Sequence, residues 1–263
     1  MIGRAAAGTL VAAAVASVAW RAGALSRSGA IAALFMGALA IAAGWRWGAL
    51  LILYFVSSSA LSRVGSRMKA RRSGSIVEKG GARDAAQVLA NGGVFAAAAV
   101  LALAHPLDIW STAAAGALAA SASDSWGTEI GMLSSSPPRM ITTLKIVPTG
   151  TSGGVSAIGL AAMVAGSLFI AVTAWLLHWN ATVALAVLLG GLTGALADSF
   201  GGALWQSRRF CASCRSATER LVHDCGTRTE RAGGLGWLDN DGINAACTLV
   251  GAVAAVCALE LLR

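Results

Sequence analysis

Long apolar runs constrain this chain more than any other feature of its sequence. They recur at about 20 residues, the length that a helix needs to cross the hydrocarbon core of a bilayer. Hydrophobic residues make up 56% of the 263 residues and charged residues only 12%, whereas about a quarter of a soluble domain is charged. The sequence therefore predicts an all-α integral membrane protein.

The runs predict about eight transmembrane helices in a single domain, residues 1–263. Their richness in Ala and Gly suits close approach between helices in lipid and permits a homodimer. The first run resembles a signal peptide, but Arg21 and Arg27 follow it directly and reverse the usual charge flank, so we interpret it as a span. The expected spans are Ala5–Trp20, Ser28–Ala43, Trp47–Leu61, Ala85–Ala104, Ile109–Met132, Val155–Leu177, Thr182–Trp205 and Gly242–Leu262.

The formal net charge of +8 is distributed unevenly along the chain. All Lys and Arg residues except Arg4, Arg46 and Arg263 lie in the loops that follow the odd-numbered spans. Because basic residues collect in cytoplasmic loops, we expect those loops in the cytoplasm and both termini outside. This topology accounts for the positive charge without a nucleic-acid partner. The Ala-rich runs and compact loops favour a bacterial plasma membrane.

Two related segments place a carboxylate inside an apolar run. SASDSWGTEIG contains Asp124, and ADSFG contains Asp198, so the chain carries a weak internal repeat. Charged residues in hydrocarbon are costly and usually mark a site or an ion path. Two carboxylates from two helices can hold Mg²⁺, which commonly bridges substrate phosphates. Interhelical hydrogen bonding and a proton relay are the alternatives. Glu129 joins this site only if the helix breaks at Gly127.

Polar residues also open the fourth and eighth spans. Asp84, Gln87 and Asn91 share one stripe of the fourth helix. Lys79 and Arg83 precede them in a glycine-bearing turn, and cations there suit phosphate. A basic flank followed by interhelical hydrogen bonds is the alternative, and it is the interpretation that we prefer for the earlier basic residues 63–72. With the residues that open the eighth span, the pattern predicts a polar site at the cytoplasmic face: Asn240, Asp241 and Asn244.

A glycine-rich segment, PTGTSGGVS at residues 148–156, stands immediately before the sixth span. Successive backbone N–H groups in such a turn, followed by a helix N-terminus, favour an anion. The spacing is not that of a Walker A loop, and a flexible loop is the alternative. The residues expected to cradle phosphate are Thr149, Gly150, Thr151, Ser152, Gly153 and Gly154.

Residues 206–240 form a predicted cytoplasmic loop that contains a cysteine and histidine pattern. Cys211, Cys214, His223 and Cys225 follow the spacing C-x₂-C-x₈-H-x-C. Four soft ligands at this spacing suit a closed tetrahedral zinc site with a structural role. Reduced free thiols are the alternative.

Together, these motifs resemble a known membrane family. KGGARDAAQVLANGG, SDSWGTEIG, PTGTSGGVS, ADSFGG, the Cys/His pattern and LDNDGIN occur in the order found in the family that includes plant phytyl-phosphate kinase, from about Ser28 to the end. The resemblance implies phosphoryl transfer from a nucleoside triphosphate, with CTP the expected donor, to phytyl-, geranylgeranyl- or polyprenyl-phosphate. The first segment is also similar to CTP-using lipid enzymes such as cytidylyltransferases and dolichol kinase.

The site residues fit phosphoryl transfer, which depends on positioning and charge more than on covalent chemistry. We expect Asp124, Asp198 and Asp241 near Mg²⁺, with Glu129 and Asp239 as further members. Lys79, Arg83 and Lys145 are expected to meet phosphates. The lipid tail would lie between helices, while the nucleotide arrives from the cytoplasm.

Three other functions stay open. A CTP-dependent cytidylyltransferase would use similar residues and release pyrophosphate. A proton- or ion-coupled transporter would also carry repeats and intramembrane carboxylates, although near the bilayer midplane. A non-catalytic membrane scaffold would not explain the presence of buried carboxylates. The tail, the nucleotide and the oligomeric state do not follow from the sequence.

Overall fold

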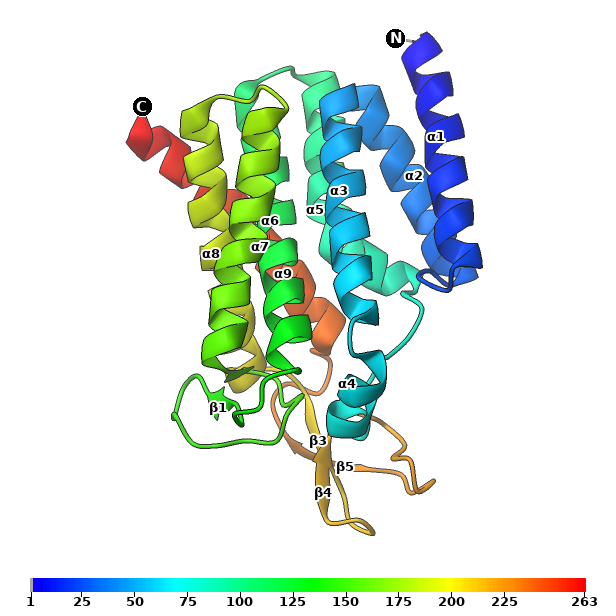
Figure 1. The fold of residues 1–263 in the computed structure, drawn as a ribbon, viewed down its shortest axis with the longest axis vertical. Helices are drawn as coiled ribbons and strands as arrows, with labels where there is room; N and C mark the ends of the chain where they lie inside the picture. The colour runs from blue at the N-terminus through cyan, green and yellow to red at the C-terminus, as the bar shows by residue number, and fades with distance from the viewer. Residues whose placement is uncertain (1) are drawn as a thin grey trace.

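The computed structural model describes residues 2–263, and long helices that run side by side dominate it (Figure 1). All eight predicted runs are helical. The helices are α1 (Ile2–Arg21), α2 (Arg27–Ala43), α3 (Trp45–Arg63), α4 (Ser66–Ser73), α5 (Ala85–Ala104), α6 (Asp108–Gly131), α7 (Ala157–Leu176), α8 (Ala181–Leu204) and α9 (Asn240–Leu262).

Five of these helices are long and apolar enough to cross a membrane: α1, α5, α7, α8 and α9. A sixth span results if α3 and α4 are taken together, although they meet at an angle of 70°. The bend lies at Gly65, whose φ of 63° is readily adopted only by glycine. α2 is apolar but has only 17 residues, and α6 carries three acidic residues. The structure therefore supports an integral membrane bundle, while the number of eight spans stays a prediction.

The polar content of α6 follows from its place at the centre of the bundle. It packs against α3, α5, α7, α8 and α9, and every residue from Ala114 to Ser123 is buried. Small side chains all around the helix permit this packing. Gly116 and Gly191 are examples, because a Cβ at either would lie 2.7 Å or less from an alanine Cβ of a neighbouring helix. A helix enclosed by protein has little need of an apolar surface toward lipid.

Larger apolar side chains form a second part of the core. Phe95, Leu118, Ile170 and Leu259 are almost completely buried in it. The ring of Trp47 packs against Phe95, with centroids 5.7 Å apart. The core therefore combines small residues around α6 with a cluster of aromatic and branched residues.

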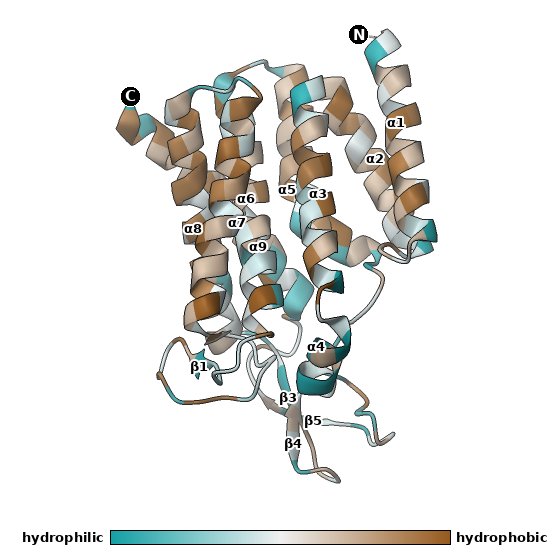
Figure 2. Cartoon of the chain, viewed as in Figure 1, coloured by the Kyte–Doolittle hydropathy of each residue, from teal (hydrophilic) through white to brown (hydrophobic). Residues whose placement is uncertain are grey.

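The connections at one end of the bundle carry the short strands and most of the hydrophilic residues (Figures 1 and 2). We call this the loop end. The connection between α6 and α7 contains β1 (Arg139–Met140) paired antiparallel with β2 (Gly154–Val155). The connection between α8 and α9 forms a three-stranded antiparallel sheet in the order β4-β3-β5, from β3 (Arg208–Cys211), β4 (Ser216–Thr218) and β5 (Glu230–Gly233). The sequence did not predict these strands.

Candidate active site

A polar pocket opens at the loop end, with an empty volume of about 1390 Å³ that includes open solvent at its mouth. The ends of α5, α6, α7, α8 and α9 and the two loop-end connections surround it. Most of the predicted site residues line this one pocket: Lys79, Arg83, Asn91, Asp124, Glu129, Thr149, Gly150, Thr151, Ser152, Gly154, Asp198, Asn240 and Asn244.

The two intramembrane carboxylates face each other inside the pocket. Asp124 near the end of α6 and Asp198 near the end of α8 lie within hydrogen-bond distance of each other. Oδ2 of Asp198 is buried and has no hydrogen-bond partner among residues 2–263. Two facing carboxylates with a free, buried oxygen suit a hard cation such as Mg²⁺, which takes oxygen ligands. The same geometry also suits a shared proton.

Glu129 lines the pocket but is already paired. Its Oε2 lies 2.5 Å from Lys69 Nζ, and its Oε1 accepts a hydrogen bond from Ser62 Oγ at 2.6 Å. The helix break at Gly127 that the sequence interpretation required for Glu129 to join the site is absent, because α6 continues to Gly131, and Glu129 reaches the pocket from an unbroken helix. Gly127 instead lets α7 approach, since a Cβ there would lie 2.4 Å from Met163 Cγ. Glu129 therefore fixes the wall of the pocket against α3 and α4.

The sequence suggested that Lys69 belongs to a solvated basic flank, but in the structure this residue is buried. Its side chain is only 7% exposed. Besides Glu129, its Nζ donates to the carbonyl oxygen of Leu61 at 2.8 Å. A buried ammonium group with these partners holds the bent α4 against the end of α3, in agreement with the rule that buried charges are paired.

Lys79 joins two of the predicted acidic residues. Its Nζ lies 2.5 Å from Asp241 Oδ2 and 3.2 Å from Asp84 Oδ2. The hydrogen bond to Asp241 is the main reason that the pKa of Lys79 is raised above its usual value. Asp84 also caps α5, where its carboxylate and the side chain of Gln87 form a reciprocal capping box. A protonated Lys79 therefore stands at the rim of the pocket at all physiological pH values.

Asp241 is not placed beside Asp124 and Asp198. It lines a small neighbouring pocket of about 260 Å³, together with Lys79 and Asn240. The reason is its position in the first turn of α9, which directs it toward the basic turn before α5. Asp239, another expected member, caps α9 by accepting a hydrogen bond from the Gly242 amide.

Lys145 also lies outside the pocket. The chain turns sharply before it at Leu144, whose φ is 57°, and the Lys145 side chain is exposed. Its carbonyl oxygen accepts a hydrogen bond from the amide of Met140, which ties the turn to β1. The structure therefore gives Lys145 no place among the pocket-lining residues.

The glycine-rich loop covers the end of α8, close to Asp198. Gly153 has a φ of 77°, and a Cβ there would lie 2.7 Å from the backbone nitrogen of Ala203. Gly153 thus packs against α8 while its neighbours Ser152 and Gly154 line the pocket. Pairing of Met140 with Gly154 anchors the loop from the other side. The loop is therefore held in place at the pocket.

Glu219 is a pocket residue that the sequence reading missed. It follows β4 and reaches the glycine-rich loop, where its Oε1 accepts a hydrogen bond from Ser152 Oγ at 2.5 Å. Burial, together with the nearby Glu78 carboxylate, raises the pKa of Glu219 to about 7, even though the Ser152 hydrogen bond acts in the opposite direction. It lies within the Cys/His loop, and no local motif distinguishes it from other surface glutamates.

Asn91 belongs to a buried polar chain that joins three helices. Its Oδ1 accepts a hydrogen bond from Ser121 Oγ at 2.7 Å, and Ser121 Oγ lies 2.6 Å from the hydroxyl of Tyr54. Its own amide donates to the carbonyl oxygen of Gln87. These contacts fix α3, α5 and α6 around the pocket, so Asn91 has a positioning role.

An apolar pocket adjoins the polar one, and its empty volume of about 740 Å³ includes the open space at its mouth. Residues of α1, α2, α3 and α5 line it, including Val15, Met36 and Phe55. Arg83, Gln87 and Asn91 line both pockets. The two spaces therefore meet at a short polar edge at the start of α5.

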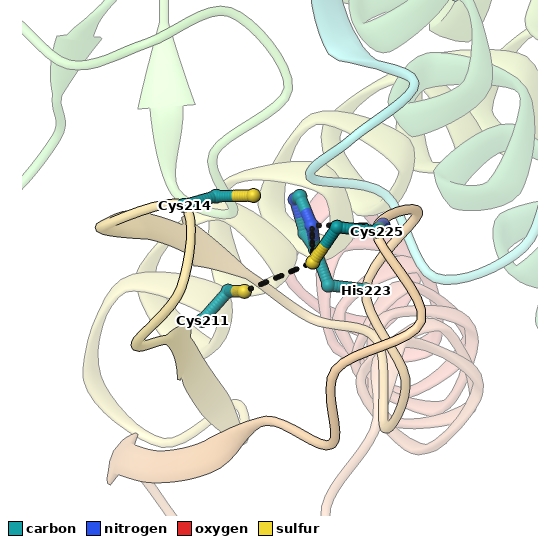
Figure 3. A group of neighbouring side chains, drawn as sticks. All are labelled: Cys211, Cys214, His223 and Cys225. Carbon is teal, nitrogen blue, oxygen red and sulfur yellow. Dashed lines mark hydrogen bonds between the residues drawn. The ribbon is translucent and has the colours of Figure 1, made fainter.

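The four predicted zinc ligands converge in the sheet at the loop end (Figure 3). The Sγ atoms of Cys211, Cys214 and Cys225 and a ring nitrogen of His223 all lie within 4.8 Å of one another. The cluster stands apart from the carboxylate pair, and none of its members lines the polar pocket.

With this geometry established, comparison with known proteins identifies the family. The family described as "Integral membrane protein DUF92" matches residues 10–252 of this chain. The chain belongs to this family. The family resemblance stated from the motifs is thereby confirmed, and so is the class of helical integral membrane protein. No solved structure matches the chain.

Three similar proteins illustrate how far the similarity extends. Protein PGR of Arabidopsis thaliana is 35% identical over an alignment of 248 residues that covers 84% of this chain and 84% of its own. An uncharacterised membrane protein of Methanocaldococcus jannaschii is 32% identical over 186 residues, 70% of this chain and 76% of its own. An uncharacterised membrane protein of Synechocystis is 28% identical over 219 residues, 82% of this chain and 74% of its own.

Proposed function

We propose that this DUF92 protein is a Mg²⁺-dependent kinase that transfers a phosphoryl group from a nucleoside triphosphate to an isoprenoid monophosphate. The product is the isoprenoid diphosphate, and CTP is the expected donor. One observation supports this most directly: a polar pocket with two facing carboxylates meets an apolar pocket at Arg83. An acceptor with a phosphate head and an apolar tail requires such a junction.

The acceptor would lie across this junction. Its tail would fill the apolar pocket between α1, α2, α3 and α5, and its phosphate would contact Arg83. The guanidinium group of Arg83 already lies 3.4 Å from Ser62 Oγ, and Arg83 lines both pockets. A planar cation with several donors suits a phosphate. Because the acceptor is already an anion, the reaction needs no strong general base.

The nucleotide would approach from the loop end. The backbone of residues 149–154 would hold its phosphates, and Lys79 would offset their charge. Asp124 and Asp198 would hold Mg²⁺, and their facing oxygens fit this ion. When bound, Mg²⁺ would supply the positive charge that neutralises phosphate oxygens during transfer. These residues then align the two substrates, which is the main protein contribution in phosphoryl transfer.

The distribution of charge supports an orientation with the pocket facing the cytoplasm. The loop end carries most of the basic residues, and basic loops stay on the cytoplasmic side. The nucleotide pool lies there as well.

The function is tested with the purified full-length protein in detergent with Mg²⁺. CTP, ATP, GTP and UTP are offered separately with phytyl or geranylgeranyl monophosphate, and lipid diphosphate is followed by chromatography. We expect Asp124→Asn and Asp198→Asn to lower the rate by about a hundredfold or more. The matched control is Asp108→Asn, an exposed carboxylate at the opposite end of the same helix α6.

Other products would decide between the alternatives. Release of pyrophosphate with a nucleotide-linked lipid would replace the kinase by a cytidylyltransferase. No turnover by folded protein over a range of isoprenoid phosphates would contradict the enzyme proposal. Proton-coupled transport would then be examined, because two facing carboxylates also suit a proton relay.

A further inference from the structure

The structure contains a second cluster of metal-ligand residues, apart from the carboxylate pair. We propose that Cys211, Cys214, His223 and Cys225 bind one structural Zn²⁺, and that this ion braces two walls of the polar pocket. The metal site itself does not depend on the proposed kinase activity. The second part of the proposal concerns residues 218–220, which lie between the two pairs of ligands in the sequence.

The interatomic distances in the cluster fit tetrahedral zinc. Cys211 Sγ lies 3.6 Å from Cys225 Sγ, and His223 Nδ1 lies 3.3 Å from Cys225 Sγ. Ligands about 2.0–2.3 Å from a tetrahedral Zn²⁺ are separated from each other by about 3.3–3.8 Å. The Sγ–Sγ distance is also much longer than the bond of about 2.05 Å in a disulfide. Small rotations of the side chains would complete the coordination.

Two tight turns bring the ligands together. The first follows β3, which ends at Cys211, and the residue after Cys214 is Arg215, with a φ of 50°. The second contains His223 and Cys225, and the next residue, Gly226, has a φ of 81°. Each ligand pair is thus followed by a left-handed residue that reverses the chain. Both turns present their ligands to the same point, as Figure 3 shows.

The surroundings of the histidine select one of its nitrogens. Nδ1 faces Cys225, while Nε2 lies 3.4 Å from Ser216 Oγ. Metal-bound histidines usually donate the hydrogen of their other nitrogen to a neighbouring oxygen, which fixes the ring. Cys211 and His223 are buried, so half of the coordination shell is shielded from solvent. Three thiolates and one imidazole favour zinc over the hard cations that carboxylates select.

The segment between the two ligand pairs contacts both walls of the polar pocket. Thr218 Oγ1 donates to the carbonyl oxygen of Ser75, and the Glu219 amide donates to that of Ile76, each at 2.8 Å. These contacts hold the segment that leads into Lys79. On the other side, the Glu219 carboxylate accepts the hydrogen bond from Ser152 of the glycine-rich loop. Coordination fixes both ends of this bridge, and so it holds the two loops at a set separation.

The first measurement determines the metal content of the protein. Full-length protein is purified in detergent without added metal, and its content is determined by inductively coupled plasma mass spectrometry. We expect about one Zn²⁺ per chain, bound with release of the thiol protons. Cys214→Ser/Cys225→Ser changes the two exposed ligands and should lose the metal. Cys257→Ser, an exposed cysteine on α9, should keep it.

The bracing is then tested by removing the ion from the wild-type protein with a chelator. Trypsin cleavage within residues 206–240 should accelerate by about tenfold or more, and readdition of Zn²⁺ should reverse it. Cleavage in the 75–83 segment should accelerate with it, and helix content by circular dichroism should stay constant.

Two results would overturn the proposal. The first is folded wild-type protein without stoichiometric zinc, or with a disulfide among these cysteines by intact mass. The second is a zinc-free protein whose 75–83 segment is cleaved no faster, which would remove the bracing role. Neither measurement uses catalytic turnover, so failure of this proposal and failure of the kinase proposal are distinguishable.

Discussion

Ser152 donates its hydroxyl hydrogen to Glu219 across 2.5 Å, although the two residues are 67 positions apart in the sequence. The contact joins the glycine-rich loop between α6 and α7 to the sheet between α8 and α9. It also places a carboxylate at the wall where the proposed nucleotide phosphates would lie.

The charge of Glu219 should control anion binding. With a pKa of about 7, Glu219 is neutral below that pH and ionised above it, where it adds negative charge beside Ser152, Glu78 and Asp198. Nucleotide affinity should therefore fall as the pH rises through about 7, and Glu219→Gln should remove most of that dependence. Isothermal titration calorimetry of wild type and Glu219→Gln over a pH series measures the nucleotide affinity. Equal pH dependence in both proteins would contradict the prediction.

The same carboxyl group should contribute to stability. Its pKa is raised from 4.5 to about 7 in the folded protein, so the native state keeps a proton that the unfolded chain releases. The contribution is fully present below about pH 4.5 and is lost as the pH rises through about 7. The thermal midpoint of wild type should decline across that window more than the midpoint of Glu219→Gln. Parallel curves for the two proteins would show that Glu219 does not titrate there.

The buried pair of Lys69 and Glu129 should be costly to break from one side. Lys69→Met leaves the Glu129 carboxylate without its cation, which costs about 3–5 kcal/mol for a buried pair. Lys69→Met/Glu129→Leu should recover much of this loss. Arg67→Met, an exposed residue of the same helix α4, is the control and should change little. Thermal unfolding in detergent ranks the stabilities of these variants. Equal effects of Lys69→Met and Arg67→Met would refute the pairing.

Filling the apolar pocket should select against long acceptors. Ala33 lines this pocket from α2, and the larger side chain of Ala33→Phe would occupy part of it. We expect kcat/KM for a twenty-carbon isoprenoid phosphate to fall by about tenfold or more, with a smaller effect on a five-carbon acceptor. Ile31→Phe, at a position of α2 that is 59% exposed, is the matched control. A uniform loss for both acceptors would place the tail elsewhere.

The sequence predicted the parts of the structure that depend on local pattern. The eight helical segments follow from apolar runs, and the segments around Asp124, Asp198 and the glycine-rich loop were found from their composition. These segments do meet in one pocket, as expected from their shared end of the bundle.

The parts of the structure that depend on contacts between residues far apart in the sequence could not be predicted. Glu219 reaches the pocket only because β3 and β4 fold back beneath the bundle. Asp241 was expected beside Asp124, yet it pairs with Lys79 because the first turn of α9 faces the basic turn before α5. The apolar pocket is shaped by side chains of four helices, which no single segment encodes.

The enclosed position of α6 has a consequence for how the protein is made. Apart from Leu118, its central turns consist of alanine, glycine and serine, and every residue from Ala114 to Ser123 is buried. A segment with so little to gain from contact with lipid enters a bilayer poorly by itself. During biosynthesis, α6 therefore has to be admitted together with neighbours such as α5 and α7. The dependence of α6 on its neighbours for insertion thus comes from the same small residues that let the helices carrying Asp124 and Asp198 pack together.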